Sequence, residues 1–103
     1  MSWQDVGARA DLNEDQPLTV KVGGTEIGIF LVDGKVHALE DVCPHAYALL
    51  SQGFVLGADV ECPLHGAVFN IATGKCLKEP GGRDLKVYPA KIEGDRILVD
   101  VAG

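Results

Sequence analysis

Short runs of alternating apolar and polar residues, each ended by a glycine or proline turn, most strongly constrain how this chain can fold. Residues 18–22 and 25–32 alternate with the period of two that is typical of half-buried β-strands. Asp33-Gly34 is a strong hairpin signal, because glycine can adopt the positive φ of a tight turn, and residues 35–40 then run back. The residues expected on one buried face are Ile27, Ile29 and Leu31.

The remainder of the chain repeats this pattern. Residues 84–93 and 96–101 flank a glycine turn at 93–95, and residues 71–77 form a further predicted hairpin around Thr73-Gly74-Lys75. No segment has a sustained helical period, and residues 46–53 can hold one short turn at most. The sequence therefore predicts an all-β fold, an antiparallel sandwich or barrel-like domain, and its 103 residues are enough for one domain, 1–103.

Charge and targeting signals restrict the possible partners. The formal net charge is −6, which argues against nucleic acid and anionic membrane surfaces, since both require clusters of Lys and Arg. The N-terminus lacks the basic and apolar regions of a signal peptide, and the longest apolar run, residues 27–32, is far shorter than a membrane span. Three cysteines do not suggest a disulfide scaffold. We expect a cytoplasmic protein.

Two loops in the middle of the chain carry most of its cysteine and histidine. Cys43 and His45 are spaced as Cys-x-His, and after sixteen intervening residues Cys62 and His65 follow as Cys-x-x-His. A strand is predicted before each loop, and a proline follows each of these two cysteines, which fixes φ and removes an N–H group. Four such side chains on two loops predict a four-ligand metal site.

The ligand set alone leaves the metal open. Two Cys and two His also bind structural zinc, although zinc sites usually pair cysteine with cysteine and histidine with histidine along the chain. Here each loop offers one of each, which suits a two-iron cluster with both cysteines on one iron and both histidines on the other. His37 is expected to be an exposed strand residue, and Cys76 a packed apolar residue or spare thiol.

The two loops resemble the Rieske [2Fe–2S] signature. CPHA and CPLHGAVFN match its ligand spacing, and residues 50–55, 69–75 and 87–101 resemble the Rieske-type ferredoxins of bacterial aromatic-ring-hydroxylating dioxygenase systems. The resemblance implies a Rieske-like antiparallel β-sandwich whose cluster-binding subdomain spans about residues 41–80. It also implies one [2Fe–2S] cluster per chain. Its ligands would be Cys43 and Cys62 on the inner iron and His45 and His65 on the outer iron.

The function that this resemblance implies is electron transfer. The chain would be no enzyme but a carrier, taking single electrons from an NAD(P)H-dependent flavin reductase and passing them to a terminal oxygenase, and it would act as a monomer. Residues 79–82 resemble the family's proline loop. These residues and Leu64 would shield the cluster from water. The alternatives are a Rieske component of a nitrite reductase or monooxygenase, and a structural zinc module.

Acidic residues flank both loops, and they have two possible roles. Glu40 and Asp41 precede the first loop, and Asp59 and Glu61 precede the second. They could steer a basic docking surface of a partner, or they could form an ordinary solvated surface. The sequence does not reveal which aromatic compound the system oxidises or which class of reductase serves it.

The sequence departs from respiratory Rieske proteins at four positions, and these departures predict the reduction potential. Ala48 and Leu64 replace the two cysteines of the inter-loop disulfide, and Ala67 and Phe69 replace the serine and tyrosine that donate hydrogen bonds toward sulfur. Such hydrogen bonds stabilise the reduced cluster and raise its potential. We therefore expect a midpoint near the lower end of the Rieske range of about −150 to +300 mV. Voltammetry that gave a positive midpoint would contradict this expectation.

Overall fold

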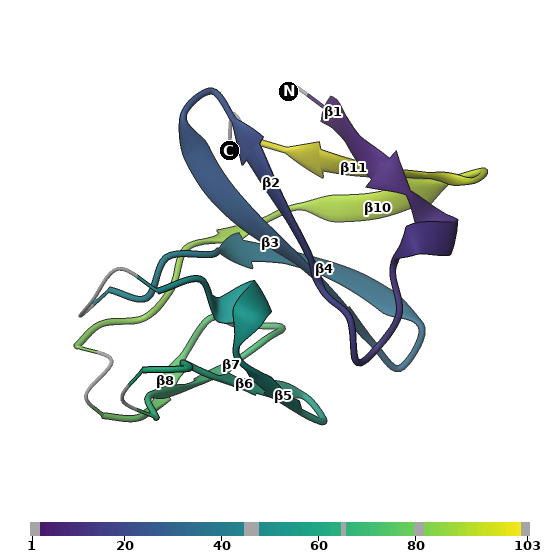
Figure 1. Cartoon of the computed structure of the whole chain (residues 1–103). Helices are drawn as coiled ribbons and strands as arrows, with labels where there is room; N and C mark the ends of the chain where they lie inside the picture. Colours follow the sequence, from purple (N-terminus) through teal and green to yellow (C-terminus); the bar gives the residue numbers. More distant parts are fainter. Residues whose placement is uncertain (1–2, 45–47, 65, 80–81, 102–103) are drawn as a thin grey trace.

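The fold is built almost entirely from β-strands (Figure 1). A computed structural model describes residues 3–44, 48–64, 66–79 and 82–101. Its strands pair antiparallel in three sheets, which confirms the predicted all-β class. Within these ranges no helix has the length and apolar character needed to cross a membrane.

The middle sheet has the order β2-β3-β4-β9. Its strands are β2 (Leu18–Val22), β3 (Thr25–Val32), β4 (Lys35–Glu40) and β9 (Val87–Tyr88). The first three have the bounds predicted from sequence. At the β3–β4 turn both Asp33 (φ 51°) and Gly34 (φ 76°) lie in the left-handed region, as a two-residue hairpin turn with the twist of its strands requires.

The second sheet has the order β1-β11-β10 and contains the N-terminal strand. Its members are β1 (Trp3–Ala8), β10 (Ala90–Glu93) and β11 (Arg96–Asp100). The hairpin predicted around residues 93–95 is confirmed by β10 and β11, but its first strand is shorter than 84–93, because Pro89 divides that segment into β9 and β10, which pair in different sheets. Proline has no N–H group for a sheet ladder, so the chain changes sheets at this residue. Strand β1 was not predicted, and its pairing with β11 is irregular between Asp5 and Gly7.

The third sheet is small and has the order β5-β6-β7-β8. Its strands, each of three residues, are β5 (Phe54–Leu56), β6 (Asp59–Glu61), β7 (Val68–Asn70) and β8 (Cys76–Lys78). The predicted hairpin at 71–77 exists, but residues 71–75 form its loop. Asn70 explains the longer loop, because its side-chain oxygen accepts hydrogen bonds from the N–H and hydroxyl groups of Thr73.

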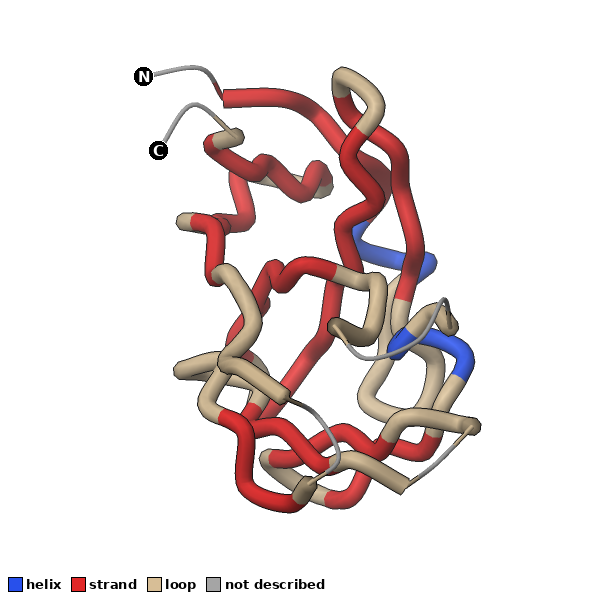
Figure 2. The backbone as a smooth tube through the Cα atoms, turned by 90° about the vertical axis from the view of Figure 1, so that its left-hand side faces the viewer, coloured by secondary structure: helices blue, strands red, loops and turns tan. Residues whose placement is uncertain are grey.

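Two short 3-10 helices complete the described structure. They are η1 (Arg9–Asp11) after β1 and η2 (Leu50–Gln52) before β5. Helix η2 confirms the short turn predicted within residues 46–53. In two perpendicular views the small sheet lies at one end of the molecule and the chain termini at the other (Figures 1 and 2).

Strand β3 is buried on both faces because it contributes to two apolar cores. Ile27, Ile29 and Leu31 share one core with Ile97 and Val99 of β11, as the predicted alternation requires. Phe30, on the opposite face, joins a second core that lies against the small sheet. Members of this second core from outside the middle sheet are Cys43, Ala48, Leu50, Val60, Cys62, Ala67, Phe69, Ile71 and Leu85. The middle sheet therefore joins the two ends of the molecule.

Gly74 provides a test of the contact between the β7–β8 loop and the segment before β9. Its φ is +73°, and a Cβ atom there would lie 2.4 Å from the carbonyl oxygen of Leu85. Gly94 has a similar φ of +60° but no atom within 4 Å of a Cβ position. Left-handed backbone costs other residues about 1–2 kcal/mol, and a core clash typically adds about 1–3 kcal/mol.

We therefore expect Gly74→Ala to lower the free energy of unfolding by at least about 1 kcal/mol more than Gly94→Ala does. Urea denaturation followed by circular dichroism measures both values. Equal losses in the two variants would show that the contact at Leu85 adds nothing to stability.

Candidate iron–sulfur site

The first predicted ligand loop begins at Cys43, shortly after β4 ends. Cys43 is buried in the core beside the small sheet, and its backbone N–H donates to the carbonyl of Ala48 over 2.9 Å. An isolated bridge pairs Val42 with Leu49 just outside that bond. The loop therefore leaves and re-enters the core at neighbouring positions. His45 lies outside the described residues.

The second loop begins at Cys62, directly after β6, and returns into β7. Cys62 is buried, and its N–H donates to the carbonyl of Ala67 over 2.7 Å. Gly66 adopts a φ of +75°, and its N–H donates back to the carbonyl of Cys62 over 3.3 Å. Glycine is the residue that takes this backbone conformation without strain. His65 also lies outside the described residues.

The two loops are built alike. Each is six residues long, CPHAYA at 43–48 and CPLHGA at 62–67, and each is closed by a hydrogen bond from its first residue, cysteine, to its last, alanine. Both cysteines belong to the same buried core. The fold thus brings together Cys43 and Cys62, which the sequence selected as one pair of ligands, although eighteen residues separate them.

The donor set at this position suits an iron–sulfur cluster. The three cysteines, all within the described residues, form no disulfide, and the two in the loops are at most 2% exposed, surrounded by apolar residues that include Leu50 and Phe69. Thiolates are the ligands by which proteins hold such clusters. Ala67 and Phe69 are fully buried in the same core, and neither carries a side-chain hydroxyl that could donate to sulfur.

Comparison with known proteins agrees with this arrangement. The profile of the Rieske [2Fe–2S] domain matches residues 2–89. This chain belongs to the Rieske [2Fe–2S] family. It is 40% identical over 98 residues to the ferredoxin component of the naphthalene 1,2-dioxygenase/salicylate 5-hydroxylase systems of a Ralstonia species, which covers 95% of this chain and 94% of the relative.

Two solved structures show the same fold at full length. One is a chain from a complex of reduced oxygenase and oxidised ferredoxin in carbazole 1,9a-dioxygenase, with a TM-score of 0.87 and 32% identity over 94% of this chain and 91% of that one. The other is a proposed NADH-dependent nitrite reductase small subunit from Mycobacterium tuberculosis, with a TM-score of 0.84 and 30% identity. The match covers 95% of this chain and 93% of that one.

These findings confirm four predictions made from sequence. The chain is a Rieske ferredoxin of the kind found in aromatic dioxygenase systems, its fold is the Rieske fold, and its cofactor is a [2Fe–2S] cluster. It is an electron-carrier component and not itself the oxygenase. The assignment of individual ligands stays a prediction, since two of the four lie outside the described residues.

A third segment, residues 82–86, is attached to the strand that leads into the first loop. Arg83 binds the Glu40 carboxylate with both of its terminal nitrogens, at 2.9 and 2.6 Å. The backbone N–H of Lys86 donates to the same carboxylate over 3.0 Å. Within the preceding loop, the N–H of Gly82 donates to the side chain of Glu79 over 2.8 Å. Residues 80 and 81, part of the predicted proline loop, lie outside the described residues.

One of the four acidic residues beside the loops belongs neither to a docking surface nor to a solvated one. Asp41 is 0% exposed, so this part of the prediction is wrong. Glu40 is half-buried and paired with Arg83, which removes most of its field. Asp59 and Glu61 are half-buried on the small sheet, where Asp59 accepts a 3.3 Å hydrogen bond from the Asn70 amide. The burial of Asp41 comes from contacts with β3 and with η2 that the local sequence does not show.

The third histidine and third cysteine lie apart from the two loops. His37 is half-buried on β4 opposite Phe30, not exposed as predicted, and burial followed by the charge of Lys35 lowers its pKa. Cys76 is half-buried on β8 and packs against the core, and its N–H donates to the Asp84 carboxylate over 2.8 Å. This position agrees with the predicted packing role of Cys76.

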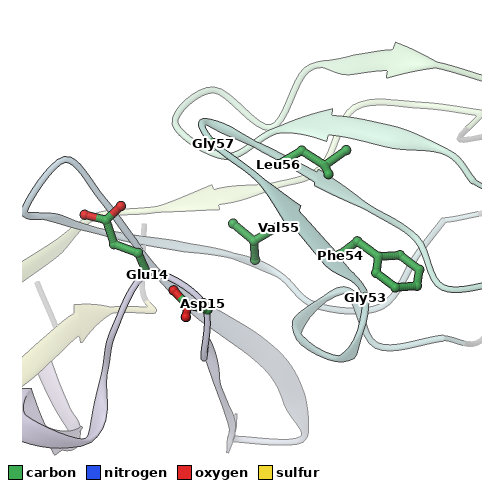
Figure 3. Close-up of a pocket in the computed structure, with 7 residues that line it drawn as sticks. All are labelled: Glu14, Asp15, Gly53, Phe54, Val55, Leu56 and Gly57. Atoms are coloured by element: carbon green, nitrogen blue, oxygen red, sulfur yellow. The ribbon is translucent and has the colours of Figure 1, made fainter.

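A surface groove of about 540 Å³ lies between the turn after η1 and strand β5 (Figure 3). The residues that line it are Glu14, Asp15, Gly53, Phe54, Val55, Leu56 and Gly57. Phe54 and Leu56 are exposed, whereas Val55 points toward the acidic turn and packs against the core. Of the predicted ligands, the two that the structure describes, Cys43 and Cys62, do not line this groove.

The Arg83–Glu40 pair makes a specific prediction about pH. The hydrogen bond from Arg83, followed by that from the Lys86 backbone, lowers the pKa of Glu40 from its ordinary value of 4.5. A lowered pKa in the folded state stabilises the protein fully above the unfolded value, and the contribution is lost as pH falls through the folded value. Because the Arg83 side chain is exposed to solvent, this contribution to the free energy of unfolding is small.

We expect Arg83→Gln to lower the melting temperature by a constant amount between about pH 6 and 8, and by a shrinking amount below about pH 4.5. Thermal denaturation at each pH measures the difference. Lys78→Gln removes the same charge from an exposed residue of β8 and serves as the control. A difference that grows on acidification would contradict the ion-pair argument.

Proposed function

We propose that this Rieske ferredoxin carries single electrons from an NAD(P)H-dependent flavin reductase to a terminal aromatic-ring-hydroxylating dioxygenase. The observation that supports this most directly is the similarity to a dioxygenase ferredoxin over 95% of the chain. A carbazole 1,9a-dioxygenase structure, in which a similar chain occurs, is a complex of oxygenase and ferredoxin. The proposal places the protein in the cytoplasm as a monomer of one domain, residues 1–103, with the cluster held within about 41–80.

The ligands in this proposal are Cys43 and Cys62 on the inner iron and His45 and His65 on the outer iron. A bound Rieske cluster accepts and releases one electron, and two neutral imidazoles in place of two thiolates make its reduction easier than in an all-cysteine cluster. Burial of both cysteines in an apolar core fits an inner position away from water. Histidine ligands at the surface would give partners the shorter path to the metal.

Apolar exposure beside the second loop fits contact with a partner. Leu64, next to His65 in the chain, is a large apolar side chain that is 57% exposed. Leu64 would be covered when the ferredoxin docks, and water would then be excluded from the space between donor and acceptor. In this proposal Leu64 shields the cluster from water, as the sequence predicts, when the ferredoxin is bound to its partner.

A second candidate is the small subunit of a nitrite reductase. The solved structure from Mycobacterium tuberculosis favours it, because the two chains match at full length with 30% identity. Both candidates use the same electron-carrying site. They differ only in the terminal acceptor, so the partner enzyme must decide between them.

Reconstitution tests the proposal. The reductase and oxygenase encoded beside this gene would be purified and mixed with NADH and an arene, with and without the ferredoxin. We expect hydroxylation coupled to NADH oxidation only when the ferredoxin is present. Coupling that survives its omission would refute the role. NADH oxidation that depends on nitrite and on this protein would favour the second candidate.

The ligand assignment can be tested with the unused residues as controls. We expect Cys43→Ser, Cys62→Ser, His45→Ala and His65→Ala to lose most bound iron and the visible absorbance. Cys76→Ser and His37→Ala should retain both, because these residues lie outside the two loops. Iron content per chain and the EPR spectrum of the reduced protein measure the outcome. Loss of iron in Cys76→Ser, or its retention in Cys62→Ser, would show that the ligands are assigned wrongly.

A further inference from the structure

The two cysteine loops are closed alike but stand on different supports. The second loop rises from the β6–β7 hairpin, where three consecutive residue pairs join the strands below it. The first loop has only the isolated bridge between Val42 and Leu49, because the chain turns into η2 at Leu50. Something other than a strand ladder must hold the two ends of the first loop together.

Asp41 occupies the position where that ladder would continue. Its carboxylate accepts two hydrogen bonds from Ser51 of η2, one from the backbone N–H over 2.8 Å and one from the hydroxyl over 2.6 Å. Its backbone carbonyl accepts from the N–H of Leu50 over 2.7 Å. Three hydrogen bonds thus connect Asp41, two residues before Cys43, to Leu50 and Ser51 of η2.

The same residue also connects the loop to the middle sheet. The N–H of Asp41 donates to the carbonyl of Glu26 at the start of β3, over 3.0 Å. A Cβ atom on Gly28 would lie only 2.6 Å from the Asp41 carboxylate and 2.8 Å from Phe30. Glycine inside a strand often marks such a close approach. The glycine of β3 therefore leaves the space that the carboxylate fills.

The Asp41 carboxylate is fully buried, which makes these bonds consequential. A buried carboxylate is costly unless hydrogen-bond donors satisfy it, and bonds to a carboxylate are about twice as strong as neutral ones. Both donors come from Ser51, on the far side of the loop. Asp41 is thus stable in the core only while the two ends of the loop stay together.

We propose that Asp41 is the positioning residue of the first ligand loop. The second loop is supported by a strand ladder, and in the first loop the hydrogen bonds that the buried Asp41 carboxylate accepts take the place of that ladder. Through Ser51 and Gly28 it fixes Cys43 relative to β3 and therefore relative to Cys62 in the shared core. The importance of this position for the cluster rests on the proposed ligands. The support of the loop by Asp41 is a property of the chain itself.

Ser51→Ala tests the proposal with a small change in volume. Hydrogen–deuterium exchange of the purified holoprotein would be followed by mass spectrometry in peptides covering residues 41–52 and 59–70. We expect opening of the first loop to become at least about tenfold more frequent, because one strong bond to the carboxylate is lost. Exchange in the second loop should stay unchanged, since its ladder is intact.

Two further variants separate positioning from general stability. Ser51→Thr keeps the hydroxyl and should restore exchange to near the wild-type rate. Gly28→Ala presses on the Asp41 carboxylate and on Phe30 from β3, and it should raise exchange in the first loop more than in the second without altering Ser51. Val99→Ala weakens the other core, in which Val99 is buried, and should raise exchange in both loops alike.

Cluster properties give an independent readout. We expect Ser51→Ala to release iron to a chelator about tenfold faster and to shift the EPR g values of the reduced protein, whereas Val99→Ala should leave the g values unchanged. First-loop exchange at the wild-type rate in Ser51→Ala, or an equal rise in both loops, would overturn the proposal. A protein that binds no iron would refute the proposed function, and the exchange comparison would still decide the role of Asp41.

Discussion

The apolar packing of the two cysteine loops against one end of the middle sheet is the interaction on which this structure depends. Phe30 of β3 and Leu39 of β4 lie in one buried core with Cys43 and Cys62. The small sheet has strands of only three residues, and its buried side chains Val60 and Phe69 pack into this same core. The core that packs against the small sheet is therefore the same core that contains Cys43 and Cys62.

The two cysteine loops are closed in the same way but are supported by different interactions. A hydrogen bond from cysteine to alanine closes each loop within six residues. The supports come from residues that lie outside the loops themselves. A β-ladder carries one loop, and the buried carboxylate of Asp41 carries the other. Supporting residues of this kind orient metal ligands and hold their geometry.

Sequence patterns predicted the hairpins because their signals are local. The alternation of β3 and the Asp33-Gly34 turn gave correct bounds for the β3–β4 hairpin. The same reasoning failed at Pro89, where one apparent strand serves two sheets, and at β1, whose partner β11 lies at the other end of the chain. The burial of Asp41 was also missed, since a polar residue beside a loop reads as solvent-exposed. A signal did exist, because a glycine interrupts the apolar run of β3.

The sequence by itself determined the all-β class, the main hairpins and the four candidate ligands, because turn residues and ligand spacing act over a few positions. Only the tertiary structure decided which side chains support those ligands. Glu40 and Arg83 are 43 residues apart, and Asp41 meets Gly28 and Ser51 from two other elements. Such contacts depend on how sheets stack, and burial then makes each hydrogen bond strong and each unpaired charge costly.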